Sequence, residues 1–192
     1  MLSKGGPVDV NVTAVPGWHT VFMSVSEPSH QLREWFVAAA IIESGPTVLL
    51  VQNRRRNGSL DWSTPGGVVE PGEETIDGLV REVIEETGIT VTEWRGPVYS
   101  VETIAPGMGW HLRVAVYEAL AWEGDIVIED PDGIVIDARF VPAHHAAVHL
   151  AANARWVSEP ITEWLEQRWD GHRTYTYDLD GADRSNIVVT RR

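Results

Sequence analysis

The feature that most constrains this chain is a short segment in which three carboxylates recur at helical spacing. Residues 74–87 have apolar positions three or four residues apart, namely Ile76, Leu79, Val80, Val83, Ile84 and Thr87. This pattern, with Gly88 as a natural end, predicts a helix. On that helix Glu82, Glu85 and Glu86 share one face, opposite the apolar stripe. Like charges this close repel one another, so the helix needs something to compensate them.

A hard divalent cation would supply that compensation, because carboxylate oxygens are the ligands that Mg²⁺ prefers. Gly78 lies one turn before Glu82 and adds no side chain, so we expect it to leave room for a substrate. Gly66 and Gly67 let the backbone approach the same place closely. The alternative is a solvated acidic helix face, and the neighbouring residues decide between the two.

Glycine, glutamate and arginine recur at fixed distances through this segment. The fixed positions are Gly67, Glu73, Arg81, Glu82, Val83, Glu85, Glu86, Gly88 and Ile89. At average residue usage such a pattern would arise by chance on the order of once in a million chains of this length. The segment therefore resembles the signature of the Nudix hydrolase family, and a looser likeness extends from Trp35 to Pro142.

This resemblance implies an α/β fold, a Nudix-type α/β/α sandwich with a mixed sheet and a signature loop and helix. It implies that Glu82, Glu85 and Glu86 bind the metal, with the Gly66 carbonyl as a further ligand, and that Glu82 or Glu85 is also the catalytic base. The implied structural residues, which orient the helix against its loop, are Gly67, Glu73 and Arg81.

The reaction that the resemblance implies is hydrolysis of a phosphoanhydride in a nucleoside diphosphate linked to another group. Mg²⁺ is the expected cofactor, with Mn²⁺ as an alternative. We expect a nucleoside triphosphate as substrate, as in the MutT-like branch, and keep ADP-ribose and nucleotide sugars as alternatives. A non-catalytic nucleotide sensor is the rival from another class.

Charge and composition limit the partners. The chain has 28 acidic and 15 basic residues, a net charge of −13, which argues against an extended nucleic acid or a polybasic membrane contact. A small anionic substrate remains compatible, since a bound cation inverts the local charge. There is no cysteine, so a cysteine nucleophile is excluded. The first residues, 1–7, lack the apolar run of a signal peptide, so we expect a cytoplasmic protein.

The order of patterns along the chain predicts one main domain. We expect an N-terminal extension at 1–33, a hydrolase domain at 34–170 and a tail at 171–192 packed on or near it. The alternating Val8, Val10 and Val12 favour an edge strand or a homodimer contact. Strands are expected at 35–42, 47–52, 97–104, 111–121, 134–141, 174–178 and 186–190, and helices at 143–154 and from Ser158-Glu159-Pro160 onward.

Three further features are candidates for substrate or metal contacts. Arg54, Arg55 and Arg56 precede the glycines and match phosphate geometry, although a solvated hairpin tip also explains them. Trp62 either stacks on a base or packs in the core. The acidic stretch 118–132 either stays solvated or adds one metal ligand, for which the candidates are Glu123, Glu129, Asp130 and Asp132.

Overall fold

The computed structural model describes residues 32–182 and 186–192. The expected N-terminal extension, with Val8, Val10 and Val12, lies outside this range except for its last two residues. The elements, in chain order, are β1 Arg33–Ser44, β2 Thr47–Arg54, β3 Leu60–Ser63, β4 Gly66–Val68, α1 Thr75–Thr87, β5 Thr90–Ala105, η1 Pro106–Met108, β6 Trp110–Glu123, β7 Val135–Pro142, η2 Ala143–His145, α2 Ala146–Leu150, α3 Arg155–Gln167, β8 Arg173–Asp180 and β9 Val188–Arg191.

The sheet is mixed, and its main path runs β3-β2-β1-β6-β5-β8-β9, with β4 paired to β1 and β7 paired to β2. Strands β1 and β6 are parallel, as are β5 and β8, whereas the other pairs are antiparallel. Strand β1 is central, because it pairs with β6 from Arg33 to Ile42, with β4 along its middle residues and with β2 at its last two.

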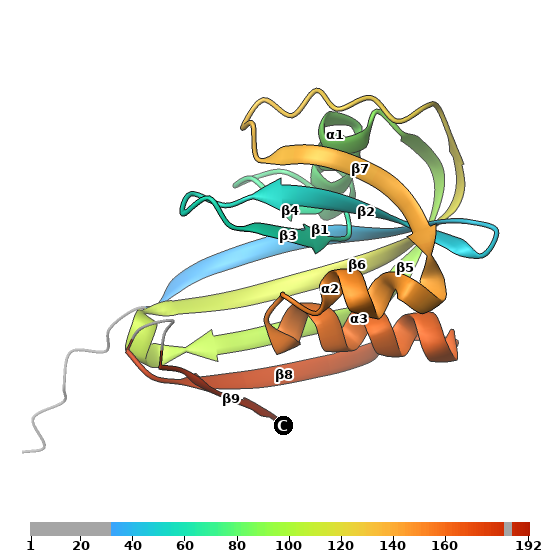
Figure 1. The fold of residues 1–192 in the computed structure, drawn as a ribbon. Helices are drawn as coiled ribbons and strands as arrows, with labels where there is room; N and C mark the ends of the chain where they lie inside the picture. The colour runs from blue at the N-terminus through green and yellow to red at the C-terminus, as the bar shows by residue number, and fades with distance from the viewer. Residues whose placement is uncertain (1–31, 183–185) are drawn as a thin grey trace, which may run out of the picture. The chain divides into compact units, whose positions relative to one another are not determined.

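Helices cover both faces of this sheet (Figure 1). Helix α1 packs on β1 and β4, whereas α3 packs on β5 and β8. Because side chains alternate along a strand, β1 contributes to both layers. Ala40 and Ile42 pack with Leu79 of α1, and Ile41 belongs to the cluster that contains Trp164 of α3. This arrangement confirms the expected α/β/α sandwich.

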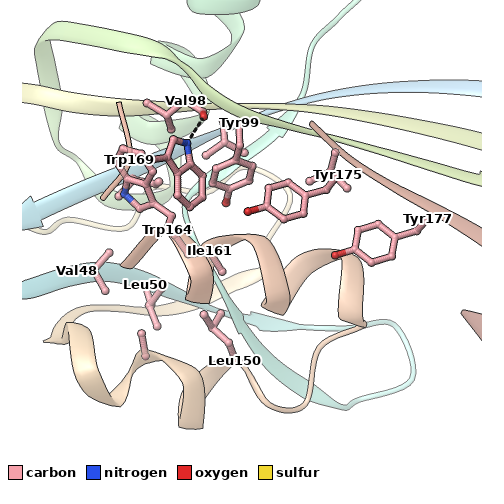
Figure 2. Packing of buried hydrophobic residues seen from close by; sticks show 14 of the residues in the cluster. Val48, Leu50, Val98, Tyr99, Leu150, Ile161, Trp164, Trp169, Tyr175 and Tyr177 are labelled. Carbon is pink, nitrogen blue, oxygen red and sulfur yellow. Dashed lines mark hydrogen bonds between the residues drawn. The ribbon is translucent and has the colours of Figure 1, made fainter. Parts of the chain in front are cut away.

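The core under α3 is aromatic, and Figure 2 shows its rings converging on the helix. Trp164 is fully buried and meets Trp169 edge to face, with ring centroids 5.0 Å apart. The Trp169 indole N–H donates to the carbonyl of Val98 at 3.0 Å. Tyr175, on β8, packs against Trp169 as well, so β8 is held to the rest of the sheet by side chains as well as by its pairing with β5.

Two helical expectations were wrong in their extent. The segment 143–154 forms only the short η2 and α2, and the chain then turns, with the N–H of Asn153 donating to the carbonyl of Leu150. Helix α3 begins at Arg155 rather than at the Ser158 signal. The Ser158 hydroxyl bonds back to the carbonyl of Ala154, so it supports a turn already formed, and Pro160 lies inside the helix.

Helix α1 ends at Gly88 as expected. Gly88 has φ of 74° and its N–H donates to the carbonyl of Ile84 at 2.8 Å. The expected division into an apolar stripe and an acidic face was wrong at two positions. Ile84 is 41% exposed, whereas Glu86 is only 9% exposed and lies among the buried residues of the helix.

Replacement of Trp164 by alanine tests the aromatic core. A fully buried tryptophan truncated to alanine typically costs about 3–5 kcal/mol of unfolding free energy, because a cavity remains. Val148→Ala is the control, since Val148 is 75% exposed and should stay within about 0.5 kcal/mol of wild type. Urea denaturation measures both. Equal losses for the two variants would contradict the core assignment.

Candidate active site

The glycine turn at β4 meets the acidic face of α1. The N–H of Gly66 donates to Oε2 of Glu86 at 2.8 Å. A Cβ added to Gly66 would lie 2.2 Å from the carbonyl oxygen of Ala38, and one added to Gly67 would lie 2.4 Å from the Glu82 carboxylate. Gly66 is required so that β4 can approach β1, because the clash there is with backbone. At Gly67 a side chain would instead displace the Glu82 carboxylate from the turn.

Arg81 connects the loop before α1 to the acidic helix face. Its guanidinium donates to both carboxylate oxygens of Glu73, at 3.2 and 3.1 Å, and to Oε1 of Glu82 at 2.7 Å. It also approaches Glu85 at 3.5 Å. The hydrogen bond from Arg81 holds the pKa of Glu73 below its usual range. These contacts fix the loop against the helix and partly neutralise Glu82.

Gly78 does not leave room for a substrate, contrary to expectation. It is buried, and a Cβ there would lie 2.7 Å from Oε2 of Glu73. Glu73 reaches over Gly78 while it accepts the hydrogen bonds of Arg81. The glycine therefore makes space for an internal ion pair rather than for a ligand.

The buried carboxylates are incompletely compensated. Burial raises the pKa of Glu86 to about 8, against the hydrogen bond from Gly66, and the charges of Glu82 and Asp130 add to the shift. Burial also raises the pKa of Glu82, opposed by Arg81 and reinforced by Glu85 and Asp132. Burial is the largest cause in both cases, and it outweighs the hydrogen bonds and positive charges that the chain offers these two carboxyl groups.

The acidic loop after β6 crosses the end of α1. The N–H groups of Val127 and Glu129 donate to the carbonyls of Thr87 and Glu85, at 2.9 and 3.0 Å. The Asp130 carboxylate accepts the N–H groups of Asp132, Ile134 and Val135, so it shapes the turn into β7. Asp132 is exposed, and its charge acts on Glu82. The loop thus brings Asp130 and Asp132, of the four expected acids, close enough to act on the helix carboxylates.

The donor set suits a hard cation, although the side chains are not arranged around one. Within residues 32–182 and 186–192, no group of three or more His, Asp or Glu side chains is placed to hold a metal ion. Glu82 and Glu85 turn toward Arg81, and Glu86 faces Gly66. The oxygen donors and their uncompensated charge fit Mg²⁺. Whether the Gly66 carbonyl is a ligand stays a prediction.

Of the three candidate arginines, only Arg55 borders the cavity described below. Its Nε and Nη2 donate to the two oxygens of Asp61, at 2.6 and 2.7 Å. Asn53, only 4% exposed, donates to Asp61 at 3.2 Å and so helps to hold it. The Arg55 charge also lowers the pKa of Glu86, against the stronger effect of burial. Arg54 and Arg56 are exposed at the hairpin tip.

Trp62 lies next to this site in a packed environment. The guanidinium of Arg139 lies over its ring, 4.9 Å from the centroid, and His149 contacts it edge to face at 5.4 Å. Its carbonyl accepts a hydrogen bond from the Asn153 side chain. Arg139 therefore occupies one face of the indole, and His149 packs against the same ring.

A cavity of about 340 Å³ opens beside the glycine turn. Arg55 and Gly66 lie on its wall, and aliphatic side chains of β1 and β6, including Val37 and Val114, line its floor. Helix α3 closes the other side with Trp156. The volume suits a small organic ligand, and its polar end lies at Gly66, which binds Glu86 of the acidic helix face.

Sequence reasoning did not identify Asp61 or Asn53. Asp61 lies on β3 and Asn53 is its partner on β2, so their role depends on the register of the hairpin around Asn57-Gly58. An acidic residue a few positions after three arginines is only weak evidence for an ion pair, because many hairpin registers would separate the two side chains.

The fold and site define an α/β protein. Its mixed sheet lies between helices, and a glycine turn lies against an acidic helix with a cavity beside it. A family model described as NUDIX domain matches residues 34–165. The chain therefore belongs to the Nudix family. Among the helices of the described ranges, none has the length and apolarity to span a membrane.

Relatives and solved structures agree with this membership. The chain is 43% identical over 63 residues to nucleoside diphosphate-linked moiety X motif 6 of Mus musculus, and 46% identical over 55 residues to Nudix hydrolase 2 of Arabidopsis thaliana. These matches cover 32% and 28% of this chain and 20% of each relative, so the chain spans about a fifth of the length of these curated relatives.

The fold is shared with solved structures, a MutT NUDIX hydrolase among them. The MutT NUDIX hydrolase from Burkholderia pseudomallei superposes with a TM-score of 0.56 at 24% identity, covering 70% of this chain and 98% of that one. The E. coli ORF135 protein superposes with a TM-score of 0.58 at 25% identity, covering 76% and 100%. The expected Nudix-type sandwich is thereby confirmed.

The buried Glu86 should make metal-free protein less stable at higher pH. The unfolded carboxyl releases its proton near pH 4.5, whereas the folded one keeps it up to about pH 8. Raising the pH through this window therefore favours unfolding. Glu86→Gln should lessen the loss of unfolding free energy between pH 5 and 8 by roughly 3–4 kcal/mol. Urea denaturation in EDTA measures it, and an unchanged pH slope would contradict the assignment.

Proposed function

We propose that this protein hydrolyses a phosphoanhydride bond in a nucleoside diphosphate linked to another group, with a nucleoside triphosphate as the leading substrate. The observation that carries the proposal is the incompletely neutralised carboxylate cluster of α1, held against Gly66 at the polar end of a ligand-sized cavity. ADP-ribose and nucleotide sugars remain alternatives. The printed names of two relatives, a human 8-oxo-dGDP phosphatase and a bovine m7GpppN-mRNA hydrolase, also describe phosphoanhydride substrates.

Glu82, Glu85 and Glu86 would hold Mg²⁺, or Mn²⁺ in its place. A cation held there would supply neutralisation of phosphate charge and a more acidic water. Glu82 or Glu85 accepts the proton of the attacking water. Glu82 is placed for this by Gly67, which lets its carboxylate reach the turn, and by Arg81, which binds one of its two oxygens. Glu85 is on the same face and more loosely held, at 3.5 Å from Arg81.

Arg55 binds the phosphate chain in this proposal. Asp61 takes Nε and Nη2 of its guanidinium, which leaves other N–H groups of the fork for the cavity and fixes the plane of the group. Arg55 borders the same cavity as Gly66, so a substrate phosphate there would lie between the arginine and the carboxylate cluster. Asp61 is a positioning residue, because it acts through Arg55.

The direct test is hydrolysis of a substrate panel by purified protein with Mg²⁺. The panel holds nucleoside triphosphates, ADP-ribose, a nucleotide sugar and a dinucleoside polyphosphate, and product release is followed by chromatography. We expect turnover that EDTA abolishes and that added Mg²⁺ or Mn²⁺ restores. Binding without any product release would instead favour a nucleotide sensor.

Glu82→Gln should lower kcat by about 10²–10⁴-fold, because it removes both a ligand charge and a candidate base. The fold should be retained, as judged by circular dichroism and the unfolding midpoint. Glu74→Gln is the matched control, since Glu74 is exposed at the start of the same helix. A near-wild-type rate for Glu82→Gln would reject the assignment, and a matching loss in Glu85→Gln would leave both carboxylates in the mechanism.

Arg55→Ala should raise KM about tenfold or more, because one charge-assisted contact to phosphate is lost. Arg56→Ala, at the exposed hairpin tip, should change KM less than twofold. Asp61→Asn should lie between them, with kcat affected less than KM. If Arg56→Ala matched Arg55→Ala, a general electrostatic effect of the hairpin would replace the specific contact.

A further inference from the structure

A second cavity continues the first one along the same face of the sheet. It has a volume of about 580 Å³. Its wall shares five residues with the inner cavity, namely Arg55, Leu112, Asn153, Trp156 and Val157. The two therefore form one trough, and Arg55 lies where the inner part meets the outer part.

Strand geometry sets the direction and length of this trough. Trp35, Val37 and Ala39 alternate on one face of β1, and Ala39 is the register partner of Gly66. Ala39 lines the inner cavity and Trp35 the outer one. Four residues of strand separate them, or about 13 Å. The trough thus runs from the glycine turn to the beginning of β1.

The two parts of the trough differ in chemistry. The inner floor is mainly aliphatic, with Tyr99 among its lining residues. The indoles of Trp35 and Trp110 line only the outer part, beside Arg55 and Asp61, and Trp156 lines both parts. Trp110 and Trp156 are tilted by 56° with centroids 6.4 Å apart, so they are not stacked on each other. Aromatic faces accept planar rings, and each stacked base contributes substantial affinity without sequence preference.

We propose that the tryptophan-lined outer cavity binds a second planar ring of the substrate, joined to the first through the phosphate chain at Arg55. This deepens the proposed function and rests on it, because it identifies the linked group as one that carries an aromatic ring. A substrate with a nucleoside at each end of its phosphates would place one ring in each part of the trough.

Binding measurements test the second ring directly. The parent is the Glu82→Gln protein with Mg²⁺, in which the ligand is consumed slowly. Its two probes are diadenosine tetraphosphate and adenosine 5′-tetraphosphate, which have four phosphates each and differ in the second adenosine. Isothermal titration should give a Kd about tenfold lower for the two-ring probe.

Trp35→Leu in this parent should reduce that ratio to less than about twofold, with the one-ring probe unchanged. Trp35 lines only the outer cavity and is not among the residues of the described core clusters, and unchanged one-ring binding reports an intact fold. Phe36→Leu is the matched control, since this neighbouring aromatic residue points to the other face of β1 and should keep the ratio.

Equal affinities of the parent for both probes, or a Trp35→Leu loss shared by both, would overturn the proposal. Failure of the proposed function looks different. In that case the wild-type protein would release no product from any nucleotide, whereas the preference for the two-ring probe and its loss in Trp35→Leu would remain.

Discussion

The contact between the Glu86 carboxylate and the backbone N–H of Gly66 is the interaction on which the rest of the site depends. It holds an acidic side chain of α1 in a buried position against β4, and β4 is in turn fixed to the central strand β1 through its register with Ala39. Glu82 lies one helical turn before Glu86 and approaches Gly67. A helix that would otherwise present a solvated acidic face thereby concentrates negative charge at the polar end of a cavity.

Local pattern was sufficient for the helix and its end at Gly88, whereas the α/β/α arrangement was implied by the family resemblance. The helix and its end depend on short-range periodicity and on a glycine that adopts φ of 74°, which a single sequence displays directly. The exact faces of the helix were less predictable. Glu86 is buried because its tertiary contact with Gly66 overrides its polar character, and Ile84 is exposed although it is apolar.

The remaining parts of the site depend on pairings between distant strands. Gly78 is explained only by Glu73, which reaches back over it to Arg81, and Arg55 is distinguished from its neighbours only by Asp61 across a hairpin. The trough requires β1 and β6 to lie side by side in parallel, with Trp35 beside Leu112. Each relation joins residues whose sequence spacing carries no periodic signal, so no local pattern predicts it.

The acidic residues of the chain have different roles, which their contacts distinguish. Glu118 pairs with Arg95 in the sheet, and Asp130 accepts three backbone N–H groups of a turn, so these acids are used structurally. Asp132 instead adds its charge to Glu82. Acidic groups are therefore concentrated where the loop meets α1, and Arg55, whose guanidinium plane is fixed by Asp61, acts on the same cluster. An anionic substrate would be repelled by these carboxylates unless a cation bound with it. With that cation, an acidic protein can bind a polyphosphate.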